Sequence, residues 1–150
     1  MKELPLYKGC FVCGDENPAG LGVRFFYVDG EGARGEFLPD ARWEGYPGVV
    51  HGGILAALLD EVMYKAVFAQ GELTVTAGIE VRYHHPARVG IPLELKGWVE
   101  GRKRRLITAR GEIRGAGGRL VAAAKGAFCV LSPAQQENLL GGSGDFEHRS

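Results

Sequence analysis

Cysteine is scarce in this sequence, neither sign of charge predominates, and long apolar runs are missing. Three cysteines in 150 residues are too few, and odd in number, for a fold held together by disulfides. Lysine plus arginine equals aspartate plus glutamate at 18 each, which argues against a nucleic-acid binder because such proteins usually carry a basic excess. No run reaches the roughly 18 apolar residues of a membrane helix, so we expect no membrane insertion. Residues 1–10 lack the apolar core of a signal peptide, and we therefore expect a cytoplasmic protein.

Glycine, in contrast, is plentiful and separates the apolar stretches of the chain. The 24 glycines fall mostly between apolar runs, as expected for turns between many strands, and hydrophobic residues make up 45% of the chain. The length fits one domain with a sizeable core. We divide the chain into a turn-rich N-terminal segment of residues 1–20, a main domain of residues 21–132, and a flexible, polar tail of residues 133–150.

One long helix is predicted over residues 51–70, which are rich in alanine and leucine and free of proline. At about 100° per residue, its large apolar side chains share one broad face that we expect to be buried. These residues are Leu55, Leu58, Leu59, Val62, Met63 and Ala66. The opposite side carries small alanines with Asp60 and Tyr64, while Glu61 and Lys65 stand four residues apart on a flank and can pair.

Six predicted strands flank this helix in the sequence, two before it and four after it. Each is identified by alternating or β-branched apolar residues between glycine-containing turns. They cover residues 21–27, 33–38, 74–85, 93–100, 106–113 and 120–131. Short connections favour antiparallel neighbours. The sequence therefore predicts an α+β fold in which an antiparallel sheet packs on one apolar helix.

The candidate active site lies at the start of the helix, in the sequence His51-Gly52-Gly53, with Asp60 nine residues after the histidine. Backbone N–H groups in the first turn of a helix have no intrahelical partner, and together they carry about half a positive charge. Glycines leave these groups open to an anion or to a developing oxyanion. A carboxylate two turns further along can serve as a base or as a nucleophile.

This motif resembles the signature of the hot-dog-fold thioesterases, in particular their PaaI-like and THEM-type members. The resemblance runs from Cys10 to Leu131 and includes the loop of residues 45–50 and the turns of residues 10–14 and 17–21. It implies a curved antiparallel sheet of about six strands wrapped around one long helix. It also implies acyl-CoA as substrate and a homodimer or homotetramer (a dimer of dimers) with the active site between two subunits. We expect no cofactor and no metal.

The resemblance also assigns roles to individual positions. Gly52 matches the glycine whose N–H polarises the thioester carbonyl, and Gly53 is its neighbour. Asp60 matches the catalytic carboxylate, which faces the helix start of the other subunit, either as a base or as a nucleophile. Thr76 falls where relatives place a serine or threonine that holds the water or the carboxylate.

One position departs from the pattern of the family. Some relatives carry an asparagine where this chain has Gly45, and Glu44 or His51 are the two candidates to replace it. His51 either hydrogen-bonds the loop or takes part in the site, and we include it among the catalytic candidates.

Two further groups of residues are candidates to bind the substrate. Arg102, Lys103, Arg104 and Arg105 form a basic hairpin, which is either a solvated turn or a contact for the phosphates of coenzyme A. Tyr46 and Tyr64 are candidates to shape the substrate pocket.

Cys10 and Cys13 form a C-x-x-C motif, which occurs in tight turns, zinc half-sites and redox pairs. Because no second C-x-x-C completes a tetrahedral set, we favour a role in a turn.

Two other functions fit parts of this pattern. Hot-dog acyl dehydratases pair a catalytic histidine with a carboxylate in a different motif, which is not present around His51. A non-catalytic acyl-CoA binding module would not need Asp60 beside the glycine pair. The sequence therefore favours hydrolysis of acyl-CoA thioesters over both alternatives.

Overall fold

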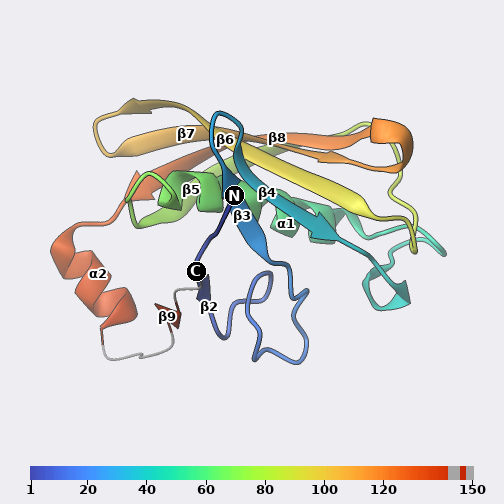
Figure 1. Ribbon diagram of the computed structural model, residues 1–150, viewed down its shortest axis with the longest axis horizontal. Helices are drawn as coiled ribbons and strands as arrows, with labels where there is room; N and C mark the ends of the chain where they lie inside the picture. The colour runs from blue at the N-terminus through green and yellow to red at the C-terminus, as the bar shows by residue number, and fades with distance from the viewer. Residues whose placement is uncertain (142–145, 148–150) are drawn as a thin grey trace.

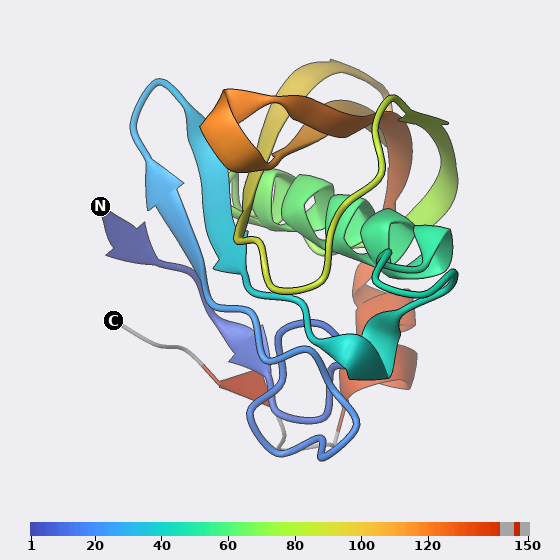
Figure 2. The ribbon, with the colours of Figure 1, turned by 90° about the vertical axis from the view of Figure 1, so that its right-hand side faces the viewer.

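A computed structural model describes residues 1–141 and the backbone of residues 146–147. It places a strongly curved antiparallel sheet around one long helix (Figures 1 and 2). The elements are β1 (Lys2–Glu3), β2 (Leu6–Tyr7), β3 (Phe25–Val28), β4 (Gly32–Phe37), α1 (Gly52–Phe68), β5 (Thr74–Tyr83), β6 (Leu93–Lys103), β7 (Leu106–Arg114), β8 (Leu120–Val130), α2 (Pro133–Leu140) and β9 (Phe146–Glu147). The predicted fold class is confirmed, since all six predicted strands and the long helix are present.

The sheet has the order β1-β3-β4-β6-β7-β8-β5, and each neighbouring pair is antiparallel. Strand β5 follows α1 in the sequence but pairs with β8, so the chain crosses from one side of the sheet to the other through the helix. One edge of β5 therefore has no strand partner among the described residues. This edge is ten residues long, and most of its side chains are exposed.

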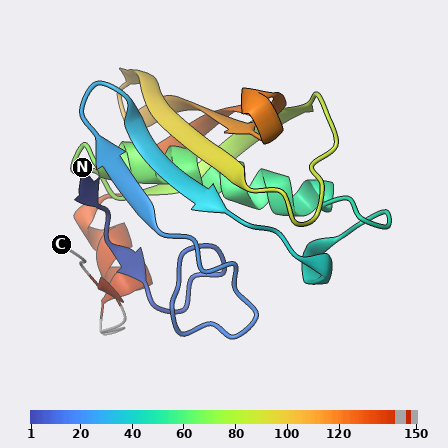
Figure 3. The same cartoon turned by 45° about the vertical axis from the view of Figure 1, so that its right-hand side comes forward.

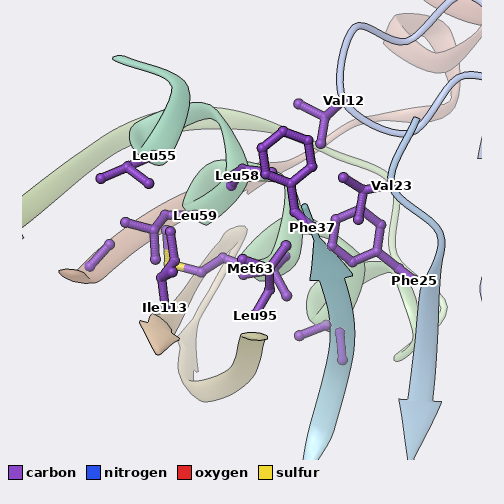
Figure 4. Packing of buried hydrophobic residues seen from close by; sticks show 14 of the residues in the cluster. Val12, Val23, Phe25, Phe37, Leu55, Leu58, Leu59, Met63, Leu95 and Ile113 are labelled. Atoms are coloured by element: carbon purple, nitrogen blue, oxygen red, sulfur yellow. The ribbon is translucent and has the colours of Figure 1, made fainter. Parts of the chain in front are cut away.

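The apolar face predicted for the helix is confirmed, because all six of its residues are buried. They pack against side chains of the sheet, among them Phe25, Phe37, Leu95 and Ile113 (Figure 4). Gly97 on β6 allows close approach, since a Cβ at this position would lie 2.4 Å from the carbonyl oxygen of Val62. Backbone of the helix thus rests directly on the sheet. No helix among the described residues is long and apolar enough to cross a membrane.

The N-terminal segment covers one flank of α1 and contributes Leu4, Leu6 and Val12 to the core. Figure 3 shows the loops of this segment in blue below the helix. The predicted pair of Glu61 and Lys65 is confirmed at 3.7 Å. Lys65 is only 4% exposed because the segment lies over it, and its Nζ donates to the carbonyl oxygen of Pro5.

Several boundaries differ from the sequence prediction, among them the end of β6, which runs to Lys103 where we expected residue 100. The first long strand starts at Phe25 and not at Leu21, because the N–H groups of Leu21 and Val23 bond to the carbonyls of Phe11 and Val12 in the N-terminal segment. These residues are buried against that segment, which explains their alternating apolar pattern.

The tail predicted to be flexible begins with a helix that we did not predict, α2. Ser132 caps this helix by accepting from the N–H of Gln135, and the side chain of Gln135 accepts from the N–H of Ser132. The signal was present in the sequence as a capping box followed by proline at the first helical position. Residues 142–145 and 148–150 of the predicted tail lie outside the described residues.

Candidate active site

The start of α1 leaves one backbone donor free. His51 is the N-cap residue, and its Nδ1 accepts from the N–H of Gly53 at 2.8 Å. The carbonyl oxygen of His51 accepts from Ile54 and Leu55 at 3.0 and 3.3 Å. The N–H of Gly52 has no hydrogen-bond partner within the described part of the chain. Of the two candidate donors, Gly52 is therefore the one available to a substrate, while Gly53 is engaged by the imidazole.

Tyr83 holds this helix start from the sheet. Its hydroxyl donates to the carbonyl oxygen of Gly52 at 2.8 Å, and its ring lies 3.5 Å from where a Cβ of Gly52 would stand. We did not predict this residue, because nothing in a strand 31 residues away indicates that it reaches the glycine motif. Tyr83 fixes the orientation of the peptide that follows the free N–H.

Asp60 meets Thr76, as the resemblance implied. The hydroxyl of Thr76 donates to Oδ1 of Asp60 at 2.8 Å, which leaves Oδ2 without this donor. Burial raises the pKa of Asp60 above that of a free aspartate, and the hydrogen bond from Thr76 partly opposes this increase in pKa. The pair forms a carboxylate that is held in place and partly withdrawn from water.

A β-bulge in β5 lets Thr76 and Tyr83 both point toward α1. Thr76 and Tyr83 are seven residues apart, and in a regular strand they would point to opposite faces. The pairing of β5 with β8 shifts between Thr76 and Gly78, so one extra residue, Ala77, sits between them. The bulge restores a common direction, and both side chains reach α1.

The two chemical groups lie far apart within one chain. Gly52 and Asp60 belong to the same helix and are separated by eight residues, which corresponds to about 12 Å along its axis. A donor to a carbonyl oxygen and a base that serves the attacking water must both lie within a few ångströms of one carbonyl. Within one copy of the chain, the two groups therefore lie about two turns of α1 apart.

The basic hairpin is divided between internal and free side chains. Arg102 pairs with Glu72 at 2.6 Å, and Arg105 donates to the carbonyl oxygen of Val130 and to Gln135. Lys103 and Arg104 are exposed, and none of the ion pairs found among the described residues involves them. Of the predicted four, Lys103 and Arg104 are therefore the cations most readily available to a phosphate group.

The register of the sheet links this hairpin to the carboxylate. Arg102 pairs with Ile107, Ile107 with Phe128, and Phe128 with Thr76. The hairpin therefore lies at the end of the sheet that carries Thr76 and Asp60.

The two predicted pocket tyrosines lie in different places. Tyr46 is 83% exposed in the loop before α1. Tyr64 lines a cavity of about 300 Å³ beneath the N-terminal segment, together with Glu61 and Lys65. The structure thus does not bring the two tyrosines together into one pocket.

Glu44 and His51, the two candidates to replace the missing asparagine, both hydrogen-bond to nearby backbone N–H groups. Oε2 of Glu44 accepts from the N–H of Gly48 at 2.9 Å and closes the loop, while His51 caps the helix. A Cβ at Gly45 would lie 3.4 Å from Cα and Cδ2 of His51, which is close van der Waals contact. The capping histidine fills the space beside Gly45.

The fold and this site define a hot-dog thioesterase: a curved sheet around one helix, with a glycine donor at the start of the helix and a carboxylate further along it. Residues 47–122, half of the chain, match the family model described as the thioesterase superfamily. The chain belongs to the thioesterase superfamily, and the resemblance predicted from the motif is confirmed.

Individual relatives agree with this assignment. Human acyl-coenzyme A thioesterase THEM5 is 30% identical over 96 residues, which are 55% of this chain and 39% of the relative. The chain thus spans about two fifths of the length of this curated relative. The crystal structure of RHA08564, a thioesterase superfamily protein, has a TM-score of 0.77 and 34% identity, and the match covers 81% of this chain and 63% of that one.

The Escherichia coli PaaI protein from the phenylacetic acid degradation operon has a TM-score of 0.68 over 73% of this chain and 83% of its own. At 22% identity, this likeness shows the fold alone.

Proposed function

We propose that two copies of this chain form an active site that hydrolyses acyl-CoA to a free acid and coenzyme A. The observation that carries the proposal is the separation of a free donor, the N–H of Gly52, from a held carboxylate, Asp60, by eight residues of one helix. Membership of the thioesterase superfamily and the likeness to an acyl-CoA thioesterase support the reaction and the substrate class.

The unpaired edge of β5 supports the assembly. A long edge strand with free backbone groups is a template for pairing with another chain. Val75 and Ile79 on this strand are 43% and 37% exposed, so apolar surface beside this edge is available for burial by a second copy. A two-fold axis at this edge joins the sheets and sets the two α1 helices antiparallel. In that arrangement, Gly52 of one subunit approaches Asp60 of the other.

The chemistry then follows from the groups present. The N–H of Gly52 donates to the thioester carbonyl oxygen and stabilises the oxyanion that forms on attack. Oδ2 of Asp60 from the facing subunit takes a proton from the attacking water, while Thr76 holds Oδ1. The tetrahedral intermediate collapses, the C–S bond breaks, and the thiolate of coenzyme A leaves and takes up a proton. Direct attack by Asp60 is the alternative, and single turnover in ¹⁸O-water followed by mass spectrometry of the Asp60 peptide distinguishes them.

The substitution Asp60→Asn tests the proposal. An asparagine keeps an oxygen that accepts from Thr76, so we expect the fold to be retained. Loss of a general base is expected to lower kcat by about 10²- to 10⁴-fold, measured by thiol release over a panel of acyl-CoA chain lengths. Asp29→Asn, an exposed carboxylate in the turn between β3 and β4, is the matched control.

Two results would contradict this function. Full turnover by folded Asp60→Asn would remove this carboxylate from the mechanism. Binding of acyl-CoA by the unaltered protein without release of thiol, over the whole panel, would indicate the non-catalytic binding module instead.

A further inference from the structure

Two cysteines of the N-terminal segment meet a glutamate of α1 outside the proposed active site. The Sγ atoms of Cys10 and Cys13 and a carboxylate oxygen of Glu61 all lie within 4.8 Å of one another. Sγ of Cys10 is 3.7 Å from Oε1 of Glu61. The cysteines come from the turn of residues 10–14, and the glutamate comes from α1, so the fold supplies a third ligand that the C-x-x-C motif lacked in the sequence.

The spacing of these atoms suits a tetrahedral cation. Zinc binds thiolate sulfur at about 2.3 Å and carboxylate oxygen at about 2.0–2.2 Å, so neighbouring ligand atoms stand about 3.5–3.8 Å apart. The separation of 3.7 Å between Cys10 and Glu61 falls in this range. Ligand atoms in this cluster lie up to 4.8 Å apart. To bind one zinc ion they must approach each other by about 1 Å, which rotation of the side chains allows.

The turn that holds the two sulfurs is tightly constrained. The N–H of Cys13 donates to Sγ of Cys10 at 3.4 Å, and the N–H of Gly14 donates to the carbonyl oxygen of Cys10 at 2.9 Å. A Cβ on Gly14 would stand 2.5 Å from the carbonyl oxygen of Cys10, so the turn requires glycine there. A backbone donor to a cysteine sulfur favours the thiolate form that binds metal.

The carboxylate is already oriented toward the sulfurs. Oε2 of Glu61 lies 3.7 Å from Nζ of Lys65, while Oε1 faces Cys10. Two thiolates and one carboxylate around a divalent cation leave one net negative charge, which buried Lys65 offsets. The cluster opens on the cavity of about 300 Å³ beside Tyr64, where a water has room to act as fourth ligand.

We propose that Cys10, Cys13 and Glu61 bind a thiophilic divalent cation, Zn²⁺ in the first instance, that fastens the N-terminal segment to α1. Each thiol binds as thiolate and gives its proton to solvent. The site holds the segment against the helix one residue beyond Asp60. It is independent of acyl-CoA hydrolysis, because metal content and thermal stability report on it without any turnover.

The test uses the full chain without a polyhistidine tag, kept reduced by a phosphine so that no disulfide forms. We expect one Zn²⁺ per chain by elemental analysis, and a midpoint of thermal unfolding, Tm, that rises with free Zn²⁺. Co²⁺ as a probe is expected to give a sulfur-to-metal charge-transfer band and the visible bands of a tetrahedral site. Cys10→Ser is expected to abolish all three signals. Cys129→Ser is the matched control, since Cys129 is a free cysteine outside the cluster and is expected to change none of them.

The variant Glu61→Gln tests whether the glutamate is a ligand or whether the two cysteines alone bind the metal. It keeps both cysteines and is expected to weaken Zn²⁺ binding by at least about tenfold. Less than one Zn²⁺ per chain in the unaltered protein would overturn the proposal, as would full binding by Cys10→Ser. If Glu61→Gln does not fold, Cys10→Ser decides, because Cys10 is only half-buried and serine replaces it with little change in volume.

Discussion

Removal of a single backbone N–H tests the oxyanion donor directly. Gly52 is the first residue of α1, the position at which proline is best tolerated because its N–H would have no intrahelical partner. The preceding residue, His51, has φ −59° and ψ 135°, which is the extended conformation that proline favours before it. Gly52→Pro therefore deletes the donor while the backbone keeps its conformation.

The expected loss follows from the role of this donor. Removing one oxyanion-hole donor typically lowers kcat by about 10²- to 10³-fold, equivalent to about 2.7–4 kcal/mol of transition-state stabilisation. Gly52→Ala is the matched control, because its Cβ would stand 3.5 Å from the ring of Tyr83, an ordinary contact, and its N–H remains. We expect the alanine variant to keep most of its activity in the same thiol-release assay.

Mixing two inactive variants tests whether the site is shared between subunits. In a heterodimer of Gly52→Pro and Asp60→Asn, one shared site carries both defects and the other carries neither. Random exchange of subunits makes half of the dimers mixed, so about a quarter of full activity is expected to return. Undiminished kcat in folded Gly52→Pro would refute the donor role, and no recovery after verified exchange would refute the shared site.

Three further outcomes follow from the geometry. Thr76→Val removes a hydrogen bond that favours the ionised form of Asp60, so the pKa of Asp60 is expected to rise further. If Asp60 is the base, the acid limb of the pH–rate profile moves to higher pH, and Thr76→Ser keeps the profile. Charge reversal at Lys103 and Arg104 is expected to raise KM for acyl-CoA more than for a truncated thioester, and equal effects would indicate a solvated turn. Gly97→Ala places a Cβ against the helix backbone and is expected to cost about 1–3 kcal/mol, lowering Tm by roughly 3–10 °C. Gly101→Ala on the same strand is the control, because its Cβ would lie 3.6 Å from the hydroxyl oxygen of Thr108, an ordinary contact. We expect this variant to unfold within about 2 °C of the Tm of the unaltered protein, measured by calorimetry.

Periodicity was sufficient to predict the helix, since the six apolar residues of its predicted face are all buried. Such a pattern records burial, and it does not record which partner causes the burial. Leu21 and Val23 alternate like a strand, yet their N–H groups bond to the N-terminal segment and not to the sheet. The boundary was therefore wrong by four residues, although both side chains are buried.

Residue spacing alone predicted only the local part of the candidate site, while Thr76 was predicted from the family resemblance. His51, Gly52 and Asp60 lie within ten residues, and helix geometry relates them to one another. Tyr83 contacts Gly52 from 31 residues further along the chain. The direction of its side chain depends on a β-bulge that the residue types do not predict. For the same reason the sequence presented Cys10 and Cys13 as an incomplete set of ligands.

Strand β5 contacts both candidate catalytic groups and also forms the unpaired edge of the sheet. Its inner face holds Asp60 through Thr76 and the helix start through Tyr83, so the positions of both chemical groups depend on one strand. Its outer edge has no strand partner among the described residues. Under the proposed function, pairing of two copies along this edge would also align the N–H of Gly52 in one copy with Asp60 of the other. A change on β5 that weakens the pairing of two copies is therefore expected to lower turnover and association together, whereas a change at Gly52 lowers turnover alone.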